Sequence, residues 1–146
     1  MVHRILIVDD SAAIRQCLRS SIERQKDLQV CGEAENGENA VARVKELIPD
    51  LVILDLQMPV MNGLDAARRI AQIAPQLPML MFTMYSSEYL VTEARAAGIK
   101  DVFSKSSGIP DGLITAIQEI LGSGNGLENA SRNPAMALTK PIEPDA

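Results

Sequence analysis

The sequence has few aromatic residues and few cysteines. Its 146 residues include no tryptophan, two tyrosines and two phenylalanines, so a hydrophobic core must be built mainly from aliphatic side chains. The two cysteines, Cys17 and Cys31, are too few for a disulfide framework. We expect both to be reduced thiols packed inside the protein.

Long apolar runs and basic stretches are also missing. No apolar run approaches the roughly 20 residues that a membrane-spanning helix requires, and a strand-like run follows His3 and Arg4 directly, so we expect no signal peptide. The formal net charge is −5 and no stretch is a basic block, which argues against a nucleic-acid-binding surface in this chain. We therefore expect a cytoplasmic protein that neither enters a membrane nor binds nucleic acid itself.

Five short apolar runs alternate with five segments of helical spacing. The runs cover residues 5–8, 28–32, 51–54, 78–82 and 100–103. Most are continuously apolar, as in parallel strands that helices cover on both faces. Between them apolar residues recur at helical intervals, as at Ile14, Leu18 and Ile22. The alternation predicts a doubly wound α/β fold with a parallel sheet and right-handed crossovers.

The ends of the helical segments carry recognisable signals. Ser11, Asn36 and Ser86 are predicted N-caps, and Gly98 is the predicted stop of the fourth helix. The pattern continues to residue 121, so we predict one domain over residues 1–121. The remaining segment, 122–146, is rich in Gly, Asn, Ser and Pro and is predicted to be a flexible tail or the start of a linker.

Charged and polar residues follow four of the five apolar runs. The first run leads directly into Asp9 and Asp10, the third into Asp55 and the fourth into Thr83, and Lys105 follows the fifth after one serine. Each has an ordinary explanation: a helix cap at Asp10, a turn at Asp55, a strand threonine and a solvated lysine. Together they place three carboxylates, a hydroxyl and an ammonium group at one edge of the sheet, where ligands bind in this architecture.

The strand order determines how close these groups lie. In the order 2-1-3-4-5, the first and third strands are neighbours about 4.8 Å apart, which brings Asp9 and Asp10 beside Asp55. Three carboxylates this close repel one another, and a hard divalent cation such as Mg²⁺ would relieve the repulsion. An aspartate can also accept a phosphoryl group, whose charge Mg²⁺ and Lys105 would neutralise while Thr83 donates a hydrogen bond.

Three segments resemble the receiver domain of two-component response regulators. PDLVILDLQMPVMNG (49–63) resembles the phosphorylation-site segment, AENGENAV (34–41) the start of the second helix, and ARAAGIKDVFSKSS (94–107) the segment that leads to the lysine of that family. The resemblance covers about residues 2–121. It implies a flavodoxin-like, five-stranded parallel sheet in the order 2-1-3-4-5.

The resemblance also implies a role for each acidic residue. Asp55 is the implied phosphoacceptor for a sensor histidine kinase. Asp10, Asp55 and the main-chain carbonyl of Gln57 would bind Mg²⁺, and Asp9 would assist through water or an indirect contact. The protein would be a signalling switch, not an enzyme, that undergoes self-phosphorylation and slow dephosphorylation.

The switch implied by the resemblance works through the phosphoryl group. Thr83 and Lys105 would hold it, and the movement of Thr83 would alter a surface of the fourth helix, fifth strand and fifth helix that could form a homodimer. Three positions depart from the usual pattern. Val102 stands where an aromatic residue is common, Met84 is bulky, and Ser106 after the lysine is similar to receivers joined to LuxR-type helix-turn-helix domains. The chain would then be the N-terminal part of a transcriptional regulator.

Three alternatives remain open from the sequence alone. A haloacid dehalogenase-type phosphatase also uses an aspartate nucleophile but requires an Asp-x-Asp motif, whereas Asp9 and Asp10 are adjacent. A receiver-fold interaction module that no longer responds to phosphate would fit the unusual Met84 and Val102. A flavin-binding protein shares the fold, but the loop after the first strand lacks a Ser/Thr/Gly-rich phosphate cradle.

Overall fold

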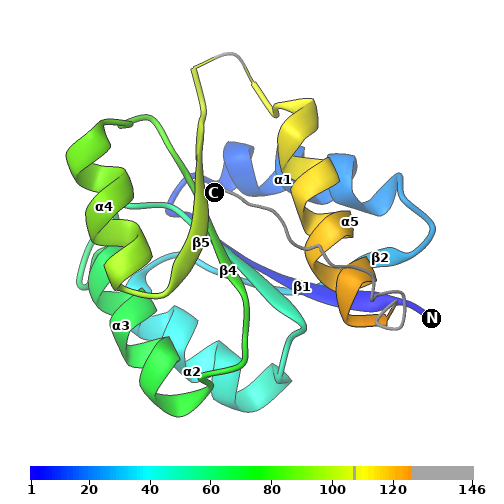
Figure 1. Ribbon diagram of the computed structural model, residues 1–146, viewed down its shortest axis with the longest axis horizontal. Helices are drawn as coiled ribbons and strands as arrows, with labels where there is room; N and C mark the ends of the chain where they lie inside the picture. The colour runs from blue at the N-terminus through cyan, green and yellow to red at the C-terminus, as the bar shows by residue number, and fades with distance from the viewer. Residues whose placement is uncertain (107, 126–146) are drawn as a thin grey trace. The chain divides into compact units, whose positions relative to one another are not determined.

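The computed structural model describes residues 1–106 and 108–125 and consists of alternating strands and helices (Figure 1). The elements are β1 His3–Val8, α1 Ala12–Glu23, β2 Leu28–Ala34, α2 Gly37–Leu47, β3 Leu51–Leu54, α3 Gly63–Ile73, β4 Met79–Thr83, α4 Glu88–Ala96, β5 Ile99–Ser104 and α5 Asp111–Asn125. The chain divides into two compact units, Met1–Ile114 and Thr115–Ala146, and the sheet and α1–α4 belong to the first.

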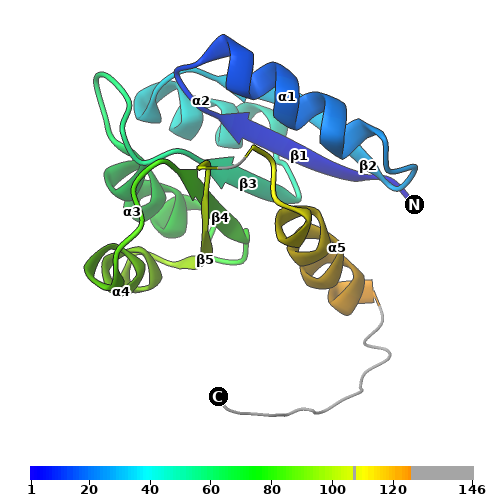
Figure 2. The same ribbon diagram turned by 90° about the horizontal axis from the view of Figure 1, so that it is seen from above.

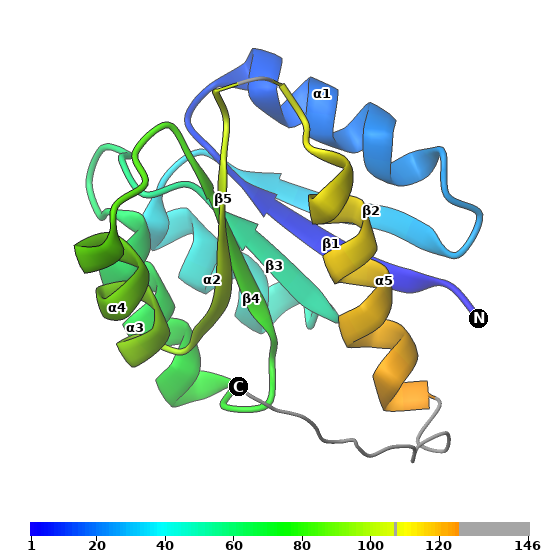
Figure 3. The same cartoon turned by 45° about the horizontal axis from the view of Figure 1, so that its top comes forward.

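The five strands form one parallel sheet in the order β2-β1-β3-β4-β5, as predicted. Figure 3 shows β1 and β3 side by side in the middle of the sheet, with the β-α loops at one end. The register pairs Val8 at the end of β1 with Leu54 at the end of β3, and Thr83 with Ser104 at the ends of β4 and β5. Leu54 of β3 pairs with Met81 of β4, so β4 ends two residues farther along. Because all five strands run in the same direction, the residues that follow them meet at one edge of the sheet.

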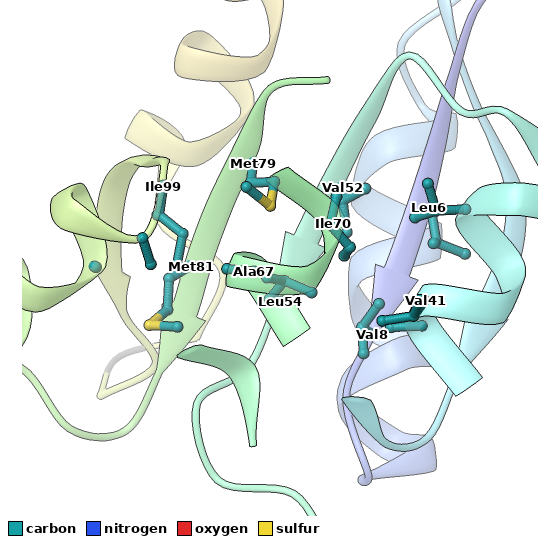
Figure 4. Packing of buried hydrophobic residues seen from close by; sticks show 14 of the residues in the cluster. Leu6, Val8, Val41, Val52, Leu54, Ala67, Ile70, Met79, Met81 and Ile99 are labelled. Atoms are coloured by element: carbon teal, nitrogen blue, oxygen red, sulfur yellow. The ribbon is translucent and has the colours of Figure 1, made fainter. Parts of the chain in front are cut away.

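The core is mainly aliphatic, as the composition predicts, and Phe82 is its one aromatic residue among the fully buried side chains of the described residues. Alternate strand residues such as Leu6, Val52 and Met79 project toward α2, α3 and α4 and form one buried cluster with them (Figure 4). On α1, which runs beside β1 and β2 (Figure 2), Leu18 and Ile22 are buried outside that cluster. Each such buried side chain contributes about 1.5–3 kcal/mol through removal from water, so the sheet is a rigid support for its loops.

Most predicted helix boundaries are confirmed. Ser11 accepts a hydrogen bond from the N–H of Ile14, and Asn36 accepts one from the N–H of Asn39, as N-caps do. Gly98 follows α4 with a φ of +101°, a conformation that glycine adopts without steric cost. These caps satisfy the free N–H and C=O groups at helix ends.

The predicted cap at Ser86 is wrong. The α4 helix begins at Glu88, so Ser87 is the residue that precedes it, and its side chain accepts from the N–H of Leu90. A capping oxygen reaches the N–H two or three residues ahead, and Ser86 lies one residue too early. Two adjacent serines left this choice open in the sequence.

The expectation of two packed thiols is wrong for Cys17. Cys17 is exposed on α1 and Cys31 is half-buried on β2. On α1 the buried positions are Leu18 and Ile22, and the residue before Leu18 is rotated about a quarter turn from that stripe. Among the described residues, no helix is both long enough and apolar enough to cross a membrane.

The α5 helix continues to Asn125, four residues past the predicted domain end at residue 121. The boundary at residue 121 was set by the last apolar residue of the helical pattern, and the polar and glycine residues after it carry no apolar periodicity that would mark a further turn. The rest of the predicted tail, residues 126–146, lies outside the described residues.

Candidate functional site

Four of the predicted site residues lie at the carboxyl edge of the sheet. Asp9 follows β1, Asp55 follows β3, Thr83 ends β4 and Lys105 follows β5. Asp9, Asp55 and Thr83 are 1%, 6% and 0% exposed. A buried carboxylate is destabilising unless it has a positively charged or hydrogen-bonding partner. Asp9 and Asp55 must therefore have such partners close by.

Lys105 is the common partner of the two buried carboxylates. Its Nζ lies 2.6 Å from Asp9 Oδ2 and 3.0 Å from Asp55 Oδ2. The ammonium group is also 5.8 Å from the centre of the Phe82 ring. One cation therefore joins the ends of β1, β3 and β5, which are far apart in the sequence.

The ionisation of this group follows from burial and pairing. Burial raises the pKa of Asp9, although hydrogen bonds from Lys105 and from the N–H of Ser11 act in the opposite direction. Burial alone would lower the pKa of Lys105, but hydrogen bonds and charges from Asp9 and Asp55 outweigh it and raise that pKa. Lys105 is therefore a fixed positive charge at neutral pH.

Asp10 supplies the third carboxylate. Its side chain is exposed, unlike those of Asp9 and Asp55, and one carboxylate oxygen from each of the three residues lies within 4.8 Å of the others. Main-chain N–H groups orient two of these residues: Ser11 donates to Asp9 Oδ1 at 2.9 Å, and Leu56 donates to Asp55 Oδ1 at 2.7 Å. Converging oxygen ligands that reach solvent fit a hard divalent cation such as Mg²⁺.

These groups line one pocket with a volume of about 800 Å³. Its lining includes every predicted site residue together with Met84 and Tyr85 of the loop after β4: Asp9, Asp10, Asp55, Gln57, Thr83, Met84, Tyr85 and Lys105. The Thr83 oxygen accepts from the N–H of Tyr85 at 3.3 Å. The pocket therefore presents carboxylates, a hydroxyl and an ammonium group to one small ligand.

The family of this chain follows from comparison with known proteins. Residues 5–118 match the family described as the response regulator receiver domain. The chain belongs to this family. A phosphatase of the haloacid dehalogenase type and a flavin-binding protein are thereby set aside, and the receiver is related to phosphoacceptor switches, as predicted.

Relatives of this receiver occur both alone and within longer proteins. It is 38% identical over 120 residues to the chemotaxis protein CheY of Thermotoga maritima, covering 82% of this chain and 98% of that protein. It is 35% identical over 140 residues to a protein-glutamate methylesterase/protein-glutamine glutaminase of Caldanaerobacter subterraneus, covering 89% of this chain but 38% of that protein. The receiver thus spans about two fifths of the methylesterase.

Solved structures agree with the predicted subclass. A LuxR-family two-component response regulator from Aurantimonas sp. SI85-9A1 is similar, with a TM-score of 0.79, 34% identity, and coverage of 84% of this chain and 87% of that one. The response regulator domain of Thermotoga maritima CheB matches with a TM-score of 0.72 and 32% identity over 89% of this chain and 98% of that one. The resemblance to LuxR-type receivers is confirmed.

A glycine allows the receiver's third helix to begin beside Asp55. A Cβ on Gly63 would collide with the main-chain carbonyl of Asp55, and the N–H of Gly63 donates to the carbonyl of Leu56 at 2.8 Å. In the intervening loop the N–H of Met61 donates to the carbonyl of Pro59 at 2.7 Å, which closes a tight turn around Val60 with a φ of +70°. That φ is strained for a β-branched residue.

Val102 and Phe103 occupy opposite faces of β5. Val102 packs against the cluster that includes α2–α4. Phe103 is the next residue and therefore points the other way, where its ring lies 3.6 Å from the position that a Cβ on Gly112 would take. Phe103 is therefore not a displaced version of the aromatic residue that many receivers carry at the position of Val102.

Sequence reasoning missed two residues next to the acidic group. Arg15 on α1 donates from Nη1 to the main-chain carbonyl of Asp9 at 2.7 Å and from Nε to Glu33 on β2 at 2.7 Å. Arg19 donates from Nε to the other oxygen of Glu33 at 2.9 Å. The spacing of Arg15 and Arg19, one helical turn apart, was the available signal, but their shared partner became visible only in three dimensions.

Proposed function

We propose that this receiver accepts a phosphoryl group on Asp55 from the phosphohistidine of a sensor histidine kinase in the cytoplasm. The observation that carries the proposal is the position of Lys105, whose ammonium group contacts both Asp9 and Asp55 in the lining of one pocket. Fixed positive charge beside a carboxylate favours transfer of an anionic group to it.

The acidic residues fit a bound Mg²⁺ ion. We assign Asp10, Asp55 and the main-chain carbonyl of Gln57 as ligands, with Asp9 acting through water. The support is the approach of three carboxylate oxygens to within 4.8 Å and the presence of Gln57 in the same pocket. When bound, Mg²⁺ supplies positive charge that offsets the charge on the phosphoryl oxygens.

The transfer replaces one bond to phosphorus with another. An oxygen of the Asp55 carboxylate forms a bond to phosphorus as the bond from phosphorus to the donor's imidazole nitrogen breaks. The donor ring, protonated on its other nitrogen, keeps the electron pair of the broken bond and leaves as neutral imidazole. Lys105, already 3.0 Å from Asp55 Oδ2, pairs with the added negative charge, and the Thr83 hydroxyl donates to a phosphoryl oxygen.

The response follows from the rearrangement of Thr83. Its oxygen now accepts from the N–H of Tyr85, so turning the hydroxyl toward a phosphoryl group changes the loop after β4. Met84, Tyr85 and Tyr89 on this loop and α4 are 63%, 57% and 75% exposed. We propose that this change alters the surface that α4, β5 and α5 offer for a homodimer or another partner.

The output is a second proposal. The Lys105–Ser106 pair and the similarity to a LuxR-family regulator support a role ahead of a DNA-binding output domain, in which this chain is the receiver and binds no nucleic acid itself. The test uses a protein in which this receiver precedes a LuxR-type DNA-binding domain. DNA binding is compared with and without phosphorylation of the receiver.

Intact mass measurement tests the phosphoacceptor. The protein is incubated with acetyl phosphate or phosphoramidate and Mg²⁺, and we expect one added phosphoryl group on the wild-type protein. Asp55→Asn should gain none, while Asp27→Asn, an exposed position away from the site, should behave as wild type. Labelling of Asp55→Asn to the wild-type extent would refute the assignment.

Beryllofluoride distinguishes a working switch from a receiver that no longer responds. With Mg²⁺ present, we expect it to change the oligomeric state or the affinity for the kinase. A protein that is labelled on Asp55 but shows neither change would be an interaction module with a silent phosphorylation site.

A further inference from the structure

Arg15 connects the acidic residues to the rest of the fold without facing the pocket. Its guanidinium donates from Nη1 to the carbonyl oxygen of Asp9 and from Nε to Glu33 Oε1, both at 2.7 Å. The carbonyl of Asp9 belongs to the peptide group that joins Asp9 to Asp10, and this group is planar. A hydrogen bond to that oxygen therefore fixes the plane from which both neighbouring aspartates project.

The carbonyl of Asp9 needs such a partner because of where it lies. β1 ends at Val8, and the N–H of Asp9 continues the ladder by donating to the carbonyl of Ala34 at 3.0 Å. The carbonyl oxygen accepts from the side chain of Arg15 instead. Asp9 is 1% exposed, and a buried carbonyl without a hydrogen bond is destabilising.

Glu33 holds Arg15 in the orientation that this contact requires. Glu33 lies on β2 opposite Ile7 of β1, and its two oxygens accept from Arg15 and Arg19, respectively. The side chain of Arg15 is 19% exposed, against 34% for Arg19. A planar guanidinium can meet two partners at once through separate donors, whereas a lysine ammonium is a single point of charge.

We propose that Arg15 is a positioning residue for the Mg²⁺ and phosphoryl site. It holds the Asp9–Asp10 peptide so that the two carboxylates keep the spacing at which they converge with Asp55. This inference rests on the proposed function, because it assigns Arg15 a part in that site. Groups that orient metal ligands typically change metal affinity by about 10- to 100-fold when they are removed.

Arg19 provides a matched control. It lies one turn from Arg15 on the same helix and binds the same carboxylate, but its guanidinium contacts the side chains of Glu33 and Glu23. Arg15→Gln and Arg19→Gln each remove one positive charge and one ion pair to Glu33. Only Arg15→Gln also removes the hydrogen bond to the Asp9 carbonyl.

Calorimetric titration of the full chain with Mg²⁺ measures the effect. We expect Arg15→Gln to weaken Mg²⁺ binding about tenfold or more and to slow labelling by acetyl phosphate at subsaturating Mg²⁺. Arg19→Gln should stay near wild type in both. Arg15→Lys keeps the charge but cannot contact both partners, so we expect its Mg²⁺ affinity to be reduced as well. If Arg15→Gln does not fold, Arg15→Lys is compared with Arg19→Gln in its place.

Nuclear magnetic resonance supplies a reading that does not depend on phosphorylation. Without Mg²⁺, the carbonyl carbon of Asp9 and the amide of Asp10 should shift in both Arg15 variants and stay in place in Arg19→Gln. A general loss of stability would not confine the shifts to this peptide.

The outcomes separate the two proposals. A wild-type protein that binds no Mg²⁺ or is not labelled on Asp55 would overturn the proposed function. If the wild type behaves as expected, equal Mg²⁺ affinities for Arg15→Gln and Arg19→Gln would overturn the positioning role. Recovery of wild-type affinity in Arg15→Lys would do the same, because charge alone would then be sufficient.

Discussion

Lys105 Nζ lies 2.6 Å from Asp9 Oδ2, although the two residues are 96 positions apart in the chain. The side chains are 7% and 2% exposed, so the pair is shielded from water on most sides. The same ammonium group reaches Asp55. The ends of three strands are therefore joined electrostatically at the place where a phosphoryl group is proposed to bind.

Removal of this cation should destabilise the protein in the absence of Mg²⁺. Lys105→Ala leaves two buried carboxylates without their shared partner, and we expect the free energy of unfolding to fall by about 2 kcal/mol. Urea denaturation measures the change. Lys100→Ala, at an exposed position of β5, should change the free energy of unfolding little. If Lys105→Ala lowered it no more than Lys100→Ala does, Lys105 would not stabilise the two carboxylates.

Mg²⁺ should stabilise the wild-type receiver. An ion that binds only the folded protein adds about 2.7 kcal/mol at a concentration 100 times its Kd, which a thermal melt with and without Mg²⁺ detects. Asp10→Asn should lose most of this gain and should melt higher than wild type without Mg²⁺, because one of three neighbouring negative charges is gone. Asp27→Asn should retain the full Mg²⁺ effect.

The Glu33 ion pairs should make stability depend on pH. Burial alone would raise the pKa of Glu33, but hydrogen bonds from Arg15 and Arg19 outweigh it and hold that pKa below its usual value of 4.5. A carboxyl group with a lowered pKa stabilises the fold above its unfolded pKa, and the stabilisation disappears as pH falls through the folded pKa.

Glu33→Gln tests this dependence. We expect the variant to be about 1 kcal/mol less stable than wild type at pH 7, and the difference to shrink as the pH falls below 4.5, the usual value. Denaturation curves across that range measure it. Glu46→Gln, which removes a carboxylate paired with the exposed Arg43, should show a smaller difference in stability from wild type. If the difference between wild type and Glu33→Gln grew as the pH fell, the ion pairs would not lower the pKa of Glu33.

Gly63 should tolerate no side chain. Because a Cβ there would meet the carbonyl of Asp55, Gly63→Ala must displace the main chain that carries the phosphoacceptor. We expect a loss of about 3 kcal/mol or more, and slower labelling of Asp55. Gly112→Ala is the control, since its Cβ would sit at an ordinary 3.6 Å from Phe103 and alanine favours helix. Similar melting temperatures for the two variants would exclude the clash.

Val60 should be replaceable with a gain in stability. It is 76% exposed, so its side chain contributes little packing, while its φ of +70° is strained. Val60→Gly should raise the free energy of unfolding by about 1 kcal/mol, the strain relieved less the entropy that glycine loses on folding. Val60→Ala removes the two γ-methyl groups but keeps the Cβ that disfavours this φ, so it should gain less.

The arrangement of the elements could be predicted because its signals are local. Continuous apolar runs at residues 5–8 and 51–54 indicate strands covered on both faces. The second run is β3 at the predicted residues, and the first lies in β1, which begins two residues earlier at His3. Asp9, Asp55, Thr83 and Lys105 were grouped correctly because parallel strands end at one edge. The fourth helix was also predicted, but the choice between Ser86 and Ser87 as its cap depended on where the first turn began.

The contacts that orient the site could not be predicted in this way. Apolar periodicity says which side of an element is buried, but not which atom of a polar side chain finds which partner. The bond from Arg15 to the carbonyl of Asp9, the ion pairs of Glu33 and the position of Lys105 between two carboxylates depend on distances of about 3 Å between segments that only folding brings together. The succession of strands and helices and the residue types at the strand ends follow from the sequence, whereas hydrogen-bond geometry depends on the packed structure.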